Sequence, residues 1–180
     1  EAWNFEGHNG AVKSVAVDSD GYVYSGSRDG TVRKISPDGN EVWSFKVDTF
    51  IYSIAVDNKG NVYSGSEDGI IRKIDTKGNL IWSLEVNSDF VNSIAVDNKC
   101  YVYVGSNDYS KNYHSVRKID PNGDQVWSFE SNNHLVYSVT VDSNGYVYSG
   151  SQDKTVTKIS SDGEEVWSFR EHNDSIVGLA

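Results

Sequence analysis

The sequence lacks several features that would indicate particular classes of protein. Its 180 residues include no methionine, two prolines and a single cysteine. Cys100 has no second cysteine to pair with, which excludes an intrachain disulfide. The missing methionine leads us to expect a processed, excised or partial piece of a longer product. No apolar run approaches the roughly 20 residues that a membrane-spanning helix needs.

Positive charge is also scarce. Lysine and arginine together number 16 against 26 aspartates and glutamates, which gives a formal net charge of −10. A protein that binds nucleic acid neutralises phosphates with clustered Lys and Arg, and an anionic membrane surface attracts the same residues. We therefore expect neither nucleic acid nor a membrane as partner. The length suits one domain with a sizeable core.

What the chain does contain is a repeat. A period near 40 residues is typical of propeller blades of four short strands, or of helical pairs of the HEAT type. Each unit is rich in Val, Ile, Tyr, Ser and Thr and is broken by Asp, Asn and Gly turns, which favours strands over helices. The repeat is marked by five tryptophans at spacings of 40, 39, 45 and 40 residues: Trp3, Trp43, Trp82, Trp127 and Trp167.

Each unit predicts four strands, here named a to d in chain order. In the first unit they cover residues 11–17, 22–27, 31–35 and 41–45. The intervening "DSDGY" and "SPDGN" have the residues that type I turns prefer. Half-units at the two ends add a strand d at 2–6 and a strand a at 176–180. The complete units cover residues 7–45, 46–84, 85–129 and 130–169.

Sheets of this kind bury both faces when they pack radially. We therefore predict an all-β fold, a single β-propeller segment over residues 1–180 built from four-stranded antiparallel blades. Four units with two half-units do not close neatly, so we expect part of a larger ring or self-association that completes one. Three recurrent residue types should be structural, namely the tryptophans between blades, the strand-b glycines and the aspartates that open the b–c turns. The glycines and aspartates are Gly26, Gly65, Gly105, Gly150, Asp29, Asp68, Asp108 and Asp153.

Residues 7–35, "GHNGAVKSVAVDSDGYVYSGSRDGTVRKI", resemble the WD-repeat family. The structural aspartate of that family falls on the four b–c aspartates, and its histidine falls on His8 alone. The Trp-Asp pair that names the family is absent. The second half of each unit, as in "IDTKGNLIW" at 74–82, is similar to quinoprotein-type (PQQ-like) propeller repeats. Quinoproteins bind a quinone and calcium in a much larger ring, and no matching set of residues occurs here, so we expect no cofactor.

Catalytic and metal-binding motifs are missing. None of the histidines forms an H-x-x-x-H pair, and no G-x-S-x-G elbow or P-loop occurs. We expect no enzyme activity and no metal site, and we assign the D-x-x-G segments to turns rather than to calcium. Cys100 replaces the glycine of the other a–b turns. If that turn needs a positive φ, the cysteine costs about 1 kcal/mol there, and we expect it to be exposed.

The copies differ most in the connections between strand d of one unit and strand a of the next. The b–c turn of the third unit also carries an insertion, "YSKNYH" at 109–114. In a four-stranded meander these connections emerge at one edge, so we expect the variable loops to form a binding face. Aromatic and histidine side chains suit such recognition. The candidate binding residues are His8, Phe50, Phe90, Tyr109, Tyr113, His114, His134 and His172.

Three functions remain open at this point. The first is a non-catalytic scaffold for protein–protein interaction through the loop face. The second is a carbohydrate- or surface-binding module, such as an adhesin or a phage or viral appendage component, in which similar tandem copies bind multivalently. The third is a fragment of an enzyme or a cofactor-binding protein, whose missing parts would lie outside this chain.

Overall fold

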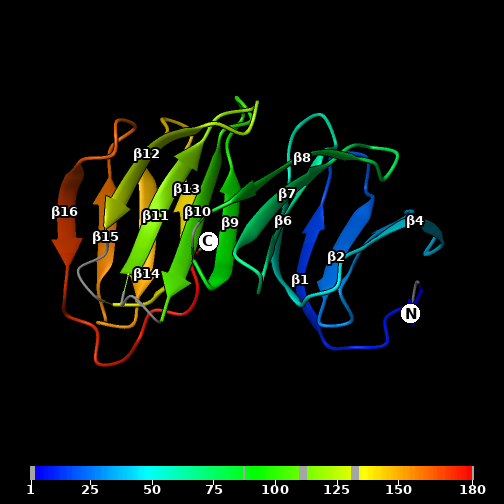
Figure 1. The fold of residues 1–180 in the computed structure, drawn as a ribbon, viewed down its shortest axis with the longest axis horizontal. Helices are drawn as coiled ribbons and strands as arrows, with labels where there is room; N and C mark the ends of the chain where they lie inside the picture. Colours follow the sequence, from blue (N-terminus) through cyan, green and yellow to red (C-terminus); the bar gives the residue numbers. More distant parts are fainter. Residues whose placement is uncertain (1–2, 87, 110–112, 131–133, 180) are drawn as a thin grey trace.

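The computed structural model describes residues 3–86, 88–109, 113–130 and 134–179, which form four antiparallel four-stranded sheets (Figure 1). The first blade consists of β1 (Val12–Val17), β2 (Val23–Ser27), β3 (Thr31–Ile35) and β4 (Glu41–Lys46). The second consists of β5 (Ile51–Val56), β6 (Val62–Ser66), β7 (Ile70–Ile74) and β8 (Leu80–Glu85). The third consists of β9 (Phe90–Val96), β10 (Val102–Asp108), β11 (Tyr113–Ile119) and β12 (Gln125–Glu130). The fourth consists of β13 (Val136–Val141), β14 (Val147–Ser151), β15 (Val156–Ile159) and β16 (Glu165–Phe169).

The predicted all-β propeller is confirmed, because each blade pairs its strands in chain order. In the first unit the strand ends agree with the prediction to within one residue. The half-units differ from it, since residues 3–6 and 176–179 form no strand. The described residues contain no helix that is long and apolar enough to cross a membrane.

Adjacent blades pack face to face. The face of each blade that carries the strand-d tryptophan is here called its trailing face, and the opposite face is called its leading face. At each interior interface the trailing face of one blade packs on the leading face of the next. Between the first two blades, Tyr24 and Val32 of the trailing face pack with Ile51 and Ile54 of the leading face. A Cβ on Gly26 would lie 2.6 Å from Cγ2 of Ile51, so the strand-b glycine allows the close approach that the sequence predicts. The three hydrophobic clusters of the core lie at these interfaces.

The predicted wedges between blades are confirmed for Trp43, Trp82 and Trp127, whereas Trp167 has no blade beside it and is 44% exposed. Trp43 Nε1 donates a hydrogen bond of 3.1 Å to the carbonyl oxygen of Thr76, in the β7–β8 turn of the next blade. The indole lies against Gly78 of the same turn, whose φ of +88° a residue with a side chain rarely adopts. A turn glycine and a backbone carbonyl therefore form a seat for the indole of Trp43, and Trp82 and Trp127 have equivalent seats in the blades that follow.

The D-x-x-G segments are turns, as predicted. In the second blade, Asp57 Oδ1 accepts the backbone N–H groups of Lys59 and Asn61 at 2.9 Å, and its Oδ2 accepts the Tyr63 hydroxyl at 3.1 Å. Lys73 lies 5.2 Å from the centre of the Tyr63 ring, a cation–π contact. Burial and the nearby Asp57 carboxylate raise the pKa of Tyr63. The same Asp–Tyr–Lys arrangement occurs in the other blades.

Two expectations about single residues need correction. Cys100 has the positive φ that its position predicts, +66°, but its side chain is buried rather than exposed, with Sγ 3.7 Å from the Asn58 side-chain oxygen of the preceding blade. Asp108 does not open a turn. The insertion lengthens the hairpin so that Asp108 lies inside β10, buried and paired with Tyr113 of β11. Asp29, Asp68 and Asp153 do accept the predicted backbone N–H groups.

The outer faces of the two end blades are only partly covered, by Trp3 on the first blade and by Ile176 and Leu179 on the fourth. On the leading face of the first blade, Val12, Val15 and Val17 are 48%, 58% and 59% exposed. On the trailing face of the fourth, Trp167 and Phe169 are 44% and 43% exposed. The four blades thus form an open arc rather than a closed ring.

Candidate functional site

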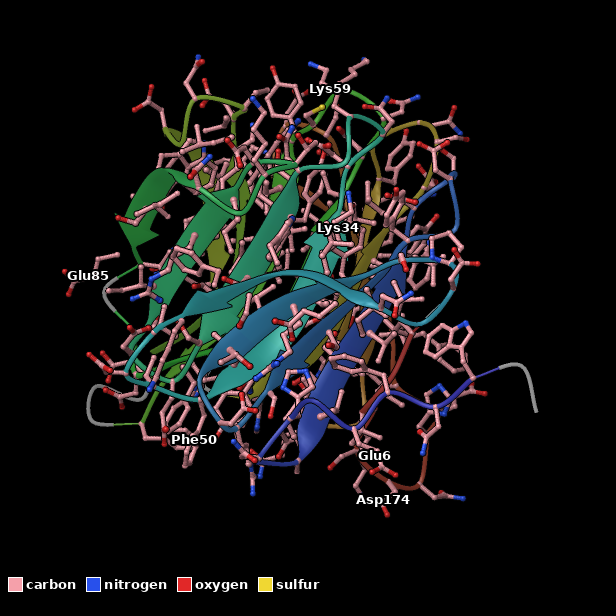
Figure 2. The ribbon with its side chains drawn as sticks, turned by 90° about the vertical axis from the view of Figure 1, so that its right-hand side faces the viewer. Glu6, Lys34, Phe50, Lys59, Glu85 and Asp174 are labelled. Atoms are coloured by element: carbon pink, nitrogen blue, oxygen red, sulfur yellow. The ribbon has the colours of Figure 1, made fainter. Side chains whose placement is uncertain are left out.

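The arc has two edges of different character. Figure 2 shows Phe50, Asp174 and Glu6 at one edge and Lys59, in the β5–β6 turn, at the opposite edge. The first edge, here called the loop face, carries the connections between blades together with the turns that join the second and third strands. These loops touch: the backbone N–H of Tyr109 donates to Oδ2 of Asp89 at 2.9 Å.

Aromatic side chains meet on the loop face across the second and third blades. The ring centres of Tyr52 and Phe90 are 6.0 Å apart, and those of Phe90 and Tyr109 are 5.3 Å apart, in edge-to-face arrangements. Such distances and angles are those that aromatic pairs prefer. Phe50, Tyr52, Phe90 and Tyr109 are here called the aromatic cluster. Phe50 and Tyr109, at its two ends, are 41% and 55% exposed.

Arg28 extends the aromatic cluster toward the first blade. Its guanidinium carbon lies 5.8 Å from the ring centre of Phe50 and 6.0 Å from that of Tyr52. A hollow beside Phe50 is lined by residues 28–30 and 46–50. An exposed guanidinium between two rings presents charge and apolar area on the same patch.

Tyr109 is the most exposed ring of the cluster and belongs to the insertion. Partial burial, with Tyr137, Tyr52 and Asp89 nearby, raises the pKa of its hydroxyl, so the group stays neutral. The cluster therefore offers a neutral hydroxyl and ring edges, a combination typical of recognition surfaces.

His114 lies beneath this surface. Its ring centre is 6.3 Å from that of Tyr109, and its side chain is 4% exposed. Burial lowers the pKa of His114, and its Nδ1 atom has no hydrogen-bond partner among the described residues. Since a buried neutral ring supports Tyr109 from below, His114 stabilises the cluster rather than forming its outer surface.

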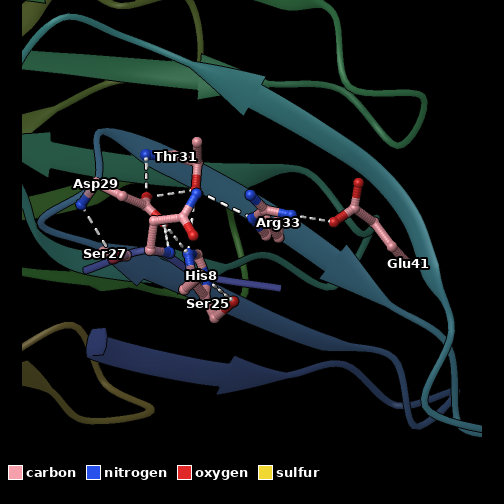
Figure 3. A network of polar contacts seen from close by, with 8 residues as sticks. His8, Ser25, Ser27, Asp29, Thr31, Arg33 and Glu41 are labelled. Atoms are coloured by element: carbon pink, nitrogen blue, oxygen red, sulfur yellow. Dashed lines mark hydrogen bonds and ion pairs between the residues drawn. The ribbon is translucent and has the colours of Figure 1, made fainter. Parts of the chain in front are cut away.

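His8 belongs to a separate polar network in the first blade (Figure 3). Its Nδ1 donates to Oδ2 of Asp29 at 2.9 Å, and its Nε2 lies 2.7 Å from Oγ of Ser25. Asp29 also accepts the Thr31 backbone N–H and hydroxyl, at 2.9 and 2.6 Å. Burial would raise the pKa of Asp29, but the hydrogen bonds from Thr31, His8 and Asn9 outweigh it and hold the pKa far below its usual range. With a side chain only 6% exposed, His8 serves this network and not the aromatic cluster.

The other candidate residues are dispersed. His134 is exposed and lies in the connection that precedes β13. His172 packs on Phe169 at 5.5 Å, at the far end of the arc. Tyr113 begins β11, and its side chain lies outside the described residues. The structure thus brings together Phe50, Phe90, Tyr109 and His114.

Two members of the site escaped the sequence analysis. Tyr52 lies within strand β5, and Arg28 directly follows the repeated S-G-S motif. The residue type at both positions varies between blades, and this variation is the sequence feature that could have identified them as site residues. The residues at these positions are Lys13, Tyr52, Asn92 and Tyr137 in the first strands, and Arg28, Glu67, Asn107 and Gln152 after the motif. The part of the chain that the structure describes contains no group of three His, Cys, Asp or Glu residues able to hold a metal ion.

Comparison with known proteins agrees with the fold. The WD40 β-propeller domain of Doa1 superimposes with a TM-score of 0.84 and 25% sequence identity, covering 99% of this chain and 61% of that one. This chain therefore spans less than two thirds of the length of that propeller. No curated protein matches the sequence. A family model described as outer membrane protein assembly factor BamB matches residues 1–109 and 112–176. Because this match covers nearly the whole sequence, the chain belongs to the BamB-type family of PQQ-like β-propeller repeat proteins.

Proposed function

We propose that the chain is a non-catalytic scaffold that binds another protein through its loop face. The main support is the aromatic cluster, in which rings from two blades and the insertion form one partly exposed patch beside Arg28. Aromatic residues and arginine are enriched at the energetic centres of protein interfaces. The family is named for an assembly factor, a protein that works with other proteins, which also favours a protein partner.

Rigidity of the scaffold supports the same proposal. Phe50 directly precedes β5, and its carbonyl accepts the Glu67 backbone N–H at 3.0 Å. Phe90 begins β9 and pairs with Asn107 of β10, so the backbone at both rings is held. Rings held on paired strands lose little conformational entropy when a partner binds. The hairpin insertion places Tyr109 at the end of the same patch, where it widens the surface without disturbing the blade.

The experiment compares partners recovered by chemical cross-linking and mass spectrometry with the wild-type chain and with Tyr109→Ala. Partners of the loop face should be recovered less with the variant, whose melting temperature should stay unchanged because the ring is half exposed. Val126→Ala, an exposed apolar change on β12, is the matched control. Equal recovery with Tyr109→Ala and with the wild type would remove the aromatic cluster from the proposal.

A glycan-binding role is the alternative. Exposed rings such as Tyr109 also pack on the apolar face of a sugar. Specific glycans retained on an array by the wild type and lost with Tyr109→Ala would favour this role over a protein partner. A quinone-dependent dye-reduction assay tests the non-catalytic assignment, and turnover above that of a heat-denatured sample would contradict it.

Self-association to complete a ring is a second candidate role. The exposed trailing face of the fourth blade favours it, because the equivalent faces of the other blades are covered. This role uses different residues from the loop face and can coexist with it.

A further inference from the structure

Arg28 lies beside the aromatic cluster, and no acidic side chain neutralises it. Arg33 and Arg72 form ion pairs with Glu41 and Asp68. In contrast, no described residue places a carboxylate within ion-pair distance of Arg28, whose side chain is exposed. Because the chain has a net charge of −10, an arginine without a carboxylate is unusual here, and its charge is available to a partner.

Contacts with two blades hold Arg28 in position. Its backbone N–H donates to the carbonyl of Ala11 at 3.0 Å in the first blade, and its guanidinium lies against Phe50 and Tyr52 of the second. A cation–π contact consumes no hydrogen-bond donor, so the five N–H groups of the guanidinium remain for an acceptor. A side chain that is already positioned loses less conformational entropy when that acceptor binds.

The hollow beside Phe50 provides a place for an acceptor of limited size and charge. Its volume is about 260 Å³. Pockets for whole small molecules measure roughly 300–1,000 Å³, so this hollow suits a side chain better. Its lining holds two cations, Arg28 and Lys46, and two carboxylates, Asp29 and Asp48. Because these formal charges cancel, a singly charged carboxylate fits the hollow better than a doubly charged phosphate.

The arrangement of Arg28 does not recur with the repeat. The equivalent positions in the later blades hold Glu67, Asn107 and Gln152, none of which is a cation. Asn107 instead bonds to the backbone of Val136 in the next blade, which is a structural role. The recurrent residues of this chain build the blades, whereas a cation that occurs once, on a variable loop face, indicates recognition.

We propose that the loop face recognises a partner segment that carries an aspartate or glutamate next to an apolar side chain. The carboxylate binds Arg28 in the hollow, and the apolar side chain packs on the rings of the aromatic cluster. The proposal rests on the loop-face scaffold proposed above and names the chemistry of its partner. A guanidinium and a carboxylate match in geometry and form two parallel hydrogen bonds. The acidic chain as a whole repels such a segment, so the contact is confined to Arg28.

The experiment selects short random peptides, displayed on phage, against the immobilised wild-type chain. The enriched peptides should share an Asp or Glu beside an aromatic or branched apolar residue, and Arg28→Gln should fail to enrich them. Arg170→Gln removes an exposed arginine that follows β16, and this matched control should enrich the same peptides as the wild type. The melting temperature of Arg28→Gln should stay close to that of the wild type, because the side chain is exposed.

A double-mutant cycle then tests the contact itself. Isothermal titration calorimetry compares an enriched peptide with its amide form, in which Gln or Asn replaces the acidic residue. The replacement should weaken binding to the wild type about tenfold or more and should have little effect on binding to Arg28→Gln. Arg28→Lys should recover only part of the affinity, because an ammonium keeps the charge but lacks the planar pair of donors.

Three results would count against the proposed contact. Enriched peptides that lack an acidic residue, but are lost with Tyr109→Ala, would overturn the carboxylate and leave the loop-face scaffold in place. Tighter binding of a peptide with phosphoserine at the acidic position would overturn the assignment to a carboxylate. If neither Tyr109→Ala nor Arg28→Gln weakens the binding of any enriched peptide, both the contact and the loop-face scaffold are overturned.

Discussion

Asn107 and Val136 belong to neighbouring blades and exchange two hydrogen bonds. The Asn107 side-chain amide donates to the Val136 carbonyl at 3.0 Å, and its oxygen accepts the Val136 backbone N–H at 2.8 Å. Both residues are fully buried, so these bonds join the third blade to the fourth where no water competes. A side chain here does what backbone pairing does within a sheet.

Asn107→Ala should therefore destabilise the fold by about 1–3 kcal/mol, because it leaves the buried Val136 N–H without its acceptor. Urea unfolding measures the change. Asn98→Ala, at an exposed turn position, is the control and should stay within about 0.5 kcal/mol of the wild type. Equal stability of the two variants would show that the cross-blade amide contributes nothing.

Asp29 should make stability depend on pH. Its pKa is lower in the folded chain than the usual value near 4, so its contribution is present above about pH 4 and is lost as the pH falls toward the folded-state value. Asp29→Asn should cost about 1–3 kcal/mol at neutral pH. The difference from the wild type should shrink below about pH 4. Urea midpoints at a series of pH values, with Asp162→Asn as an exposed control, measure this, and a constant difference would contradict it.

The strand-b glycines should tolerate no side chain. A Cβ on Gly65 would lie 2.9 Å from Cβ of Val91 in the next blade, and a branched side chain has little room to move. Gly65→Ala should destabilise by about 1–3 kcal/mol through overpacking. Gly178→Ala is the matched control, since a Cβ there meets nothing within 4 Å. Thermal unfolding measures the melting temperatures of both variants, and equal values would contradict a tight interface at Gly65.

Cys100 should be chemically protected in the folded chain. Burial raises the pKa of its thiol, which lowers the fraction of reactive thiolate. Reaction with a disulfide reagent at mildly alkaline pH should be slow in native buffer and fast in guanidinium. Because this is the only cysteine, the absorbance change reports on Cys100 alone. Fast reaction of the native chain would show that the site opens readily.

The repeat predicts the blades because the residues that form each strand and turn are close together in the sequence. Contacts that depend on a neighbouring blade were harder to predict. Trp167 and Trp43 share the same "EVWSF" context, yet only Trp43 has a blade to cover it. Cys100 was expected at the surface, and it is buried against Asn58 of another repeat.

The same distinction applies to the candidate site: the sequence predicts some of its residues, and only the fold shows the contacts between them. The variability of the loops predicts Phe50, Phe90 and Tyr109. In the structure Phe90 contacts both Tyr109 and Tyr52, and Arg28 links Tyr52 to Phe50. The regular strand pattern concealed Tyr52. His8 lies in a variable connection, but its partner Asp29 is 21 residues away. Only the folded blade shows that the histidine is internal.

The two exposed indoles, at the ends of the arc, also give the protein a distinct optical property. In each interior seat the indole Nε1 donates a hydrogen bond to a backbone carbonyl, so the three indoles should have similar emission wavelengths. They are Trp43, Trp82 and Trp127. Trp3 and Trp167 are 38% and 44% exposed, so they should contribute the red-shifted part of the emission and be the indoles that iodide quenches most. The fluorescence of the unmodified chain therefore distinguishes the two ends of the arc from the interfaces between blades.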